Sequence, residues 1–207
     1  SNLTVRGGTY VDAGGDGVFV ESLSGPIVLD GVTTIGAWRN GLSVISAGDG
    51  LLVRSSTFSD TNGTAPMCGV DIEPDSSNDL LRGVVFSNVQ LLRNKRCGFT
   101  MSPIQMINST IPIEVTVNNM VIRNVPGTAY EWGRPPDHNV GGIGMKLLNS
   151  YNLSGKVDIH NAFISQTYAS ALYLDNWPNG YISVLFDGLH IANVTHGIGE
   201  TRWHGVQ

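Results

Sequence analysis

A short apolar segment that follows a glycine or another small residue recurs along the whole chain. Its copies are GVFV at 17, GLSV at 41, GVDI at 69, GFTM at 98, GIGM at 142, ALYL at 171 and GIGE at 197. The first four begin 24 to 29 residues apart. Repeats of this length are typical of chains that stack one small unit on the next, because a single unit cannot bury its apolar face alone.

Two further apolar segments belong to each repeat. The first has the form of PIVLDG, LLVRSS, GVVFSN, IEVTVNN, KVDIHN and ISVLFDG, and the second, directly after it, the form of SSTFSD, NVQLLRN, NMVIRN, NAFISQ and GLHIAN. β-Branched residues fill these segments, and Gly, Asn and Asp lie between them, so they predict strands joined by tight turns. No helical pattern of useful length competes. One repeat is therefore three short strands.

The order N-x-φ-x-N, several residues, then G-φ-x-φ, where φ is an apolar residue, resembles the right-handed parallel β-helix proteins of the pectin-lyase-like superfamily. The resemblance extends from Leu3 to Glu200. It implies an all-β fold, a right-handed parallel β-helix solenoid of about seven coils with three short strands per coil. A leucine-rich solenoid would need a regular Leu and Asn spacing that is absent, and a β-sandwich would not explain the fixed order of the three segments.

Length and charge limit the classes of function. The 207 residues predict a single domain over 1–207, and leave open that it is a piece of a longer chain. A net charge of −5 argues against a nucleic-acid partner, and no apolar run is long enough to predict a membrane span. From the resemblance we expect a polysaccharide as partner, a monomer or a homotrimer, and an extracellular or virion-associated location.

Alternation along the G-φ-x-φ strands defines a column of outward positions, which we expect to form the floor of an open groove. In chain order its members are Phe19 and Glu21, Ser43 and Ile45, Asp71 and Glu73, Thr100 and Ser102, Gly144 and Lys146, Tyr173 and Asp175, and Gly199 and Thr201.

Asp71 and Glu73 are the leading catalytic candidates in this column. Their Cα atoms should lie about 7 Å apart, from two residues of strand rise, which suits a pair of acids in an inverting glycosidase. Three alternatives stay open: a solvated acidic edge, a carboxylate that caps the turn at 74–79, and a calcium site completed by Asp75 or Asp79. The predicted reactions require no cofactor.

Lys146 and Asp175 complete the catalytic set. A lyase needs a base and a cation that stabilises an enolate, and Lys146 is the basic member of the column, two coils from Glu73 and one from Asp175. A plain ion pair between Lys146 and Asp175 is the alternative.

Long departures from the repeat supply candidates for substrate binding. The segment 126–141 carries Tyr130, Trp132, Arg134 and His138, the segment DNWPNGY carries Trp177, and Tyr173 lies on the preceding strand. Long loops on a repetitive scaffold are often functional, and aromatic side chains stack on the apolar faces of sugar rings.

Two other columns have a structural interpretation. The resemblance implies a ladder of turn-lining amides at Asp60, Asn94, Asn124, Gln166 and Asn193. Cys68 and Cys97 each precede a repeat glycine, one repeat apart, and we expect both to face inward with Cα atoms roughly 5 Å apart. Two stacked thiols are the preferred interpretation, and a disulfide is the alternative.

The motifs of polygalacturonases, pectate lyases and mannuronan epimerases are absent, so no family catalytic residue can be transferred to this chain. We therefore favour a carbohydrate-active enzyme, a glycosidase or a lyase, that cleaves a polysaccharide in a groove along the β-helix. The alternative is a non-enzymatic glycan-binding or structural β-helix from a phage-type tailspike, an adhesin or a larger enzyme.

Overall fold

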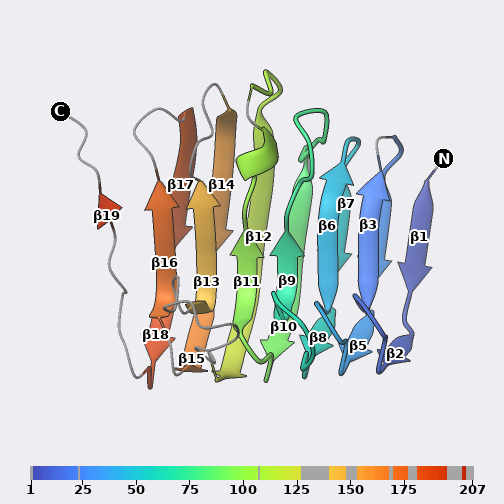
Figure 1. The fold of residues 1–207 in the computed structure, drawn as a ribbon, viewed down its shortest axis with the longest axis vertical. Coiled ribbons are helices and arrows are strands. Elements are labelled where there is room, and N and C mark those ends of the chain that lie inside the picture. The colour runs from blue at the N-terminus through green and yellow to red at the C-terminus, as the bar shows by residue number, and fades with distance from the viewer. Residues whose placement is uncertain are drawn as a thin grey trace.

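A computed structural model describes residues 2–22, 24–106, 108–126, 140–147, 153–167, 170–176, 181–194 and 202–203 (Figure 1). These residues form parallel β-sheets and one short 3-10 helix, η1 (Ile104–Met106). The all-β prediction is confirmed. No helix in the described ranges has the length and apolar character needed to cross a bilayer.

The strands form two parallel sheets, here called the long sheet and the site sheet. The main path of the long sheet is β1 (Leu3–Arg6), β4 (Ile27–Asp30), β7 (Leu51–Arg54), β10 (Val84–Leu92), β12 (Ile113–Val125), β14 (Ser154–His160) and β17 (Tyr181–Asp187). Beside this path lie β2 (Thr9–Val11), β5 (Thr33–Ile35), β8 (Thr57–Ser59), β15 (Phe163–Thr167) and β18 (His190–Ala192). The site sheet contains β3 (Val18–Ser22), β6 (Leu42–Ala47), β9 (Cys68–Ile72), β11 (Cys97–Met101), β13 (Val140–Leu147), β16 (Ser170–Asn176) and β19 (Arg202–Trp203).

Strands within each sheet pair with the equivalent strands of the repeats before and after them, and the strands at the sheet ends pair on one side. In the site sheet, β9 pairs with β6 on one side and β11 on the other, and in the long sheet β10 lies between β7 and β12. The three predicted segments of each repeat therefore meet their counterparts in adjacent repeats, and Figure 1 shows the two sheets running together along the molecule.

Apolar side chains from both sheets fill one continuous core. Val53, Phe86 and Val117 from the long sheet belong to it together with Ile72 and Phe99 from the site sheet, and each of these five is 0% exposed. The rings of Phe86 and Phe99 meet edge to face with their centroids 5.7 Å apart, which joins the two sheets directly.

The corners of the long sheet are made by single residues with positive φ. One series follows the main-path strands: Gly7, Gly31, Ser55, Asn88, Asn119, Asn161 and Gly188. The other follows the short third strands: Asp12, Gly36, Asp60, Arg93, Asn124, Gln166 and Asn193. Gly, Asn and Asp adopt this conformation at low cost, which explains their recurrence at these places.

The predicted amide series is one residue out of register in a single repeat. Asp60, Asn124, Gln166 and Asn193 share the second corner as expected, but Arg93 takes that corner in place of Asn94. Ser59 lies opposite Leu92, so Asp60 lies opposite Arg93, and the two side chains pair. Asn94 is buried one residue later, where Nδ2 donates to the Phe58 carbonyl and Oδ1 accepts from the Thr61 N–H.

The two cysteines differ from the prediction in two respects. They lie opposite each other on β9 and β11 with Cα atoms 4.5 Å apart, and they form a disulfide rather than the preferred pair of thiols. They are buried outside the main core, in a separate cluster with Tyr173, so the inward orientation was wrong. The inward place is taken by Gly69, where a side chain would meet Leu91 and Asn94.

Candidate functional site

The outward column of the site sheet has the predicted register at its first positions. Asp71 lies between Ser43 on β6 and Thr100 on β11, and Gly144 lies between Thr100 and Tyr173. A register shift after Val20 moves Glu21 beside Ser46 instead of Ile45.

Much of the described outward column is buried, contrary to the predicted open groove floor, although Phe19 is 51% exposed and Thr100 is partly exposed. Ser43, Asp71 and Tyr173 are 2%, 3% and 5% exposed, and Gly144 is also buried. The side chains of this face pack on one another: Tyr173 forms a cluster with the disulfide two strands away, and the residue between, Gly144, has no side chain to block it.

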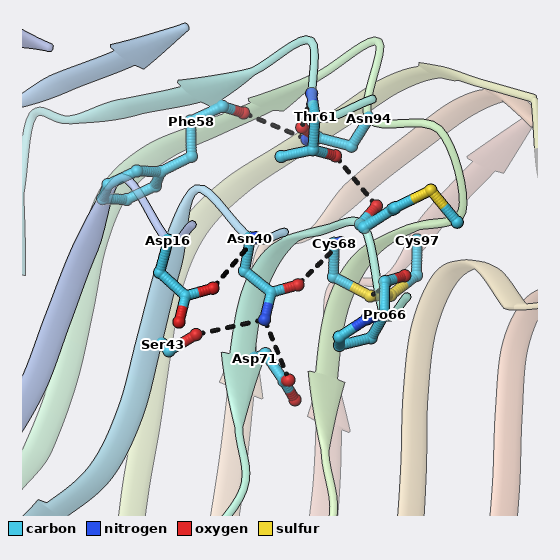
Figure 2. The surroundings of a disulfide bond; sticks show 11 residues. Asp16, Asn40, Ser43, Phe58, Thr61, Pro66, Cys68, Asp71, Asn94 and Cys97 are labelled. Atoms are coloured by element: carbon cyan, nitrogen blue, oxygen red, sulfur yellow. Dashed lines mark hydrogen bonds between the residues drawn. A yellow bond between two sulfur atoms is a disulfide. The ribbon is translucent and has the colours of Figure 1, made fainter. Parts of the chain in front are cut away.

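Asp71 is held by the turn that precedes β6. Asn40 in that turn is fully buried, and its Nδ2 donates to Oδ2 of Asp71 at 3.1 Å and to Oγ of Ser43 at 3.0 Å. Figure 2 shows these three residues together with Asp16, whose Oδ1 accepts the Asn40 backbone N–H at 3.0 Å. The carboxyl group of Asp71 thus lies within a buried polar network.

Arg39 connects the remaining charges of this region. Its Nη1 lies 3.6 Å from Oδ2 of Asp16, and its Nη2 lies 3.4 Å from Oε2 of Glu73. The Glu73 side chain is 43% exposed, whereas the Asp16 side chain is 9% exposed. Asp71 and Glu73 therefore differ: the first is buried and amide-bonded, and the second is accessible and paired with a cation.

The pKa of Asp71 is raised to about 7 from 3.8, mainly because burial disfavours the charged carboxylate. The negative charges of Glu73 and Asp16 add to this rise, while Arg39 and the hydrogen bond from Asn40 oppose it. Near neutral pH, Asp71 is thus available as a proton donor. A carboxyl group with a raised pKa beside a second carboxyl group recurs in enzymes that use one of the two as a proton donor.

The acidic turn after β9 has a structural explanation. Oδ2 of Asp79 accepts the backbone N–H groups of Asp75 and Ser76 at 2.9 and 2.8 Å, and it also lies 3.2 Å from Oγ of Ser76. Asp79, and neither Asp71 nor Glu73, is the residue that caps this turn. Among the described residues no group of three or more His, Cys, Asp or Glu side chains is arranged to hold a metal ion.

Lys146 and Asp175 lie opposite each other on β13 and β16, as the column predicts. Their side chains lie outside the part that the structure describes. The same applies to the whole of Tyr130, Trp132, Arg134, His138 and Trp177. Of the residues predicted to bind substrate, Tyr173 alone lies in a described position, and it packs against the disulfide.

Sequence reasoning missed Asp16, Arg39 and Asn40. The available signal was the position before each repeat glycine, which holds Asp16, Asn40, Cys68 and Cys97 in successive repeats. The structure links these four in order: the Asn40 N–H donates to Asp16, the Cys68 N–H donates to Oδ1 of Asn40, and Cys68 is bonded to Cys97 (Figure 2). The prediction included the two cysteines of this column, but not its polar members Asp16 and Asn40.

Comparison of the chain with protein families, with curated proteins and with solved structures finds no match. The geometry around Asp71 therefore carries the functional argument.

Proposed function

We propose that the chain is a right-handed parallel β-helix of about seven coils, of the pectin-lyase-like kind. Three observations support this: the parallel pairing of equivalent strands, three strands per repeat, and the left-handed corner residues that recur from one repeat to the next.

We further propose that it is a carbohydrate-active enzyme that hydrolyses a polysaccharide, with Asp71 as general acid and Glu73 as general base. The observation that carries the proposal is a buried Asp71 whose pKa is raised to about 7 beside an accessible Glu73. Asp71 transfers its proton to the glycosidic oxygen as the bond from that oxygen to the anomeric carbon breaks. Glu73 takes a proton from the water whose oxygen bonds to that carbon.

Hydrolysis is favoured over β-elimination by the charges around Asp71. Elimination needs a cation that stabilises the enolate of a uronate, and the Arg39 guanidinium lies between two carboxylates, those of Asp16 and Glu73. Lys146 lies two strands from β9, about 10 Å at ordinary strand spacing, so in this proposal it contacts a neighbouring sugar together with Asp175. The loop residues Tyr130, Trp132, Arg134, His138 and Trp177 stay predicted substrate contacts, and a calcium site completed by Asp75 or Asp79 stays an alternative to the catalytic role.

The test is a panel of neutral and acidic polysaccharides, assayed both for new reducing ends and for the ultraviolet absorbance of unsaturated uronates. We expect reducing ends without that absorbance, and a loss of about 100-fold or more in Asp71→Asn and Glu73→Gln. Asp75→Asn is the matched control, because it removes an exposed carboxylate from the turn that follows Glu73. Wild-type inactivity on every polymer, or full activity in Glu73→Gln, overturns the assignment.

A non-enzymatic glycan-binding or structural role is the second candidate, and the 3% exposure of Asp71 favours it, because little of that carboxyl group is accessible to a ligand. Binding of the polymer without cleavage, unchanged in Asp71→Asn, would support this role. In either case the disulfide fits an oxidising compartment, in keeping with an extracellular or virion-associated location. Light scattering would decide between a monomer and a homotrimer.

A further inference from the structure

Asn40 has hydrogen-bond partners on every side, although it is 0% exposed. Its side chain donates to Ser43 and Asp71 through Nδ2 and accepts the Cys68 N–H through Oδ1 at 3.0 Å (Figure 2). Its backbone N–H donates to Asp16, and its backbone carbonyl accepts from the Gly17 N–H at 2.8 Å. A buried residue with so many partners has one allowed orientation.

The direction of the Asn40 amide follows from chemistry rather than from the assignment of its atoms. A backbone N–H can only donate, so the group that faces Cys68 must be the amide oxygen. The NH₂ group must then face Ser43 and Asp71. Cys68 is itself fixed, because its carbonyl accepts the Gly41 N–H at 3.0 Å and its side chain is bonded to Cys97.

This direction determines how Asp71 can be protonated. Oδ2 of Asp71 accepts a hydrogen from Nδ2 of Asn40, and an oxygen that carries the carboxyl proton is a weaker acceptor than the carbonyl oxygen of the same group. The proton of the neutral carboxyl group therefore belongs on Oδ1. We propose that Asn40 is a positioning residue that keeps the acidic proton of Asp71 on Oδ1, and that the proposed hydrolysis uses this proton.

The hydrogen bond from Asn40 to Asp71 acts both before and after Asp71 gives up its proton. When Asp71 gives up its proton, the new negative charge is stabilised by Nδ2–H of Asn40, in agreement with the lowering effect of this hydrogen bond on the pKa of Asp71. The other charged groups that act on Asp71 are Asp16 and Arg39, from the turns before β3 and β6, and Glu73, just after β9. Burial, these charges and the Asn40 hydrogen bond together set the level of the pKa, and the direction of the Asn40 amide selects the oxygen.

Asn40→Asp is the variant that removes the donor to Asp71 and keeps the acceptor for Cys68. A carboxylate at position 40 can still accept the Cys68 N–H, but it cannot donate to Asp71, and it brings a further negative charge. We expect the pKa of Asp71 to rise by roughly one unit or more in this variant. The readout is carbon NMR of the side-chain carboxyl group, assigned by comparison with Asp71→Asn.

Asn94→Asp is the matched control. Asn94 is also a fully buried asparagine, but its amide bonds only to backbone groups, those of Phe58 and Thr61. A loss of stability with an unchanged Asp71 titration is expected there. A second measurement needs no variant: in the wild-type protein the side-chain NH₂ signals of Asn40 should shift with the same midpoint as the Asp71 carboxyl group.

Kinetics test the catalytic part, which depends on the proposed function. On a cleaved polysaccharide, Asn40→Asp should lower kcat by about 10- to 100-fold, and move the alkaline limb of the pH profile upward along with the NMR midpoint. The positioning role is overturned if the titration of Asp71 is unchanged in Asn40→Asp. It is also overturned if the Asn40 amide signals of the wild-type protein do not shift with the midpoint of the Asp71 carboxyl group. A shifted titration in a protein that cleaves no polysaccharide overturns the proposed function instead, and leaves the bond between Asn40 and Asp71 standing.

Discussion

The two faces of β9 are both buried, but different interactions hold them. On the inner face, Val70 and Ile72 are 0% exposed and pack among apolar neighbours such as Phe99. On the outer face, Asp71 is 3% exposed and bonds to Asn40. An apolar contact needs suitable volume, whereas a buried polar atom needs a partner of the right kind in the right direction. Among the described residues every buried polar side-chain atom has one.

A substitution on the inner face should give the largest loss in the free energy of unfolding. Phe99→Ala removes a fully buried ring that meets Phe86, and should lower the free energy of unfolding by about 3–5 kcal/mol. Thr100→Ala is the control, because Thr100 is the next residue on the same strand, points to the outer face and is partly exposed. It should cost less than about 1 kcal/mol in urea denaturation. Equal costs for the two variants would remove the distinction between the faces.

The outer face should make the stability of the protein depend on pH. Because the pKa of Asp71 in the folded protein is raised to about 7 from 3.8, the folded state binds this proton more tightly than the unfolded state between those values. Its contribution to stability is therefore complete below about pH 4, and is lost as the pH rises through 7, by as much as roughly 4 kcal/mol.

Asp71→Asn checks this prediction, because the amide stays neutral and can still accept the hydrogen bond from Asn40. The variant should lose the part of the pH dependence between pH 4 and 8 that Asp71 contributes, and should be the more stable of the two at pH 8. Parallel stability curves for the two proteins would mean that Asp71 titrates normally.

The sequence predicted the inner face better than the outer one. Alternation placed Asp71 in the outward column beside Ser43 and Thr100, which leaves the inner face of β9 to Val70 and Ile72, because apolar period and strand register are set by the repeat itself. It did not show that Asp71 would be buried. That depends on the turn residue Asn40, which lies 31 positions earlier in the sequence.

The other differences have equally local causes. The inward place at the start of β9 belongs to Gly69, so the strict alternation that holds for Val70 and Ile72 fails at Cys68 and assigned both cysteines to the wrong face. At the second corner Arg93 adopts a positive φ that usually marks Gly, Asn or Asp, so the neighbouring Asn94 was chosen instead. In both cases the local backbone geometry cannot be inferred from the type of residue at that position.

Removal of the disulfide should give the next largest loss in the free energy of unfolding. It closes a separation of 29 residues, and its removal in the double variant Cys68→Ser, Cys97→Ser should lower the free energy of unfolding by about 3 kcal/mol, since the unfolded chain is no longer cross-linked. Wild-type protein measured with a reductant should show the same loss. If neither treatment changes stability, the two residues are thiols, as the sequence had suggested.

The smallest effect is expected at the corner where Arg93 meets Asp60. The pair has two short contacts, Nε to Oδ1 at 2.7 Å and Nη2 to Oδ2 at 2.8 Å, and the Arg93 side chain is 54% exposed. Exposed ion pairs contribute little because water competes for both charges, so Arg93→Ala should cost less than about 1 kcal/mol, and less still in high salt. A double-mutant cycle with Asp60→Ala isolates the pair. A coupling energy as large as the pH-dependent contribution of Asp71 would show that exposed and buried polar contacts are equally strong in this chain, and would contradict the contrast drawn from β9.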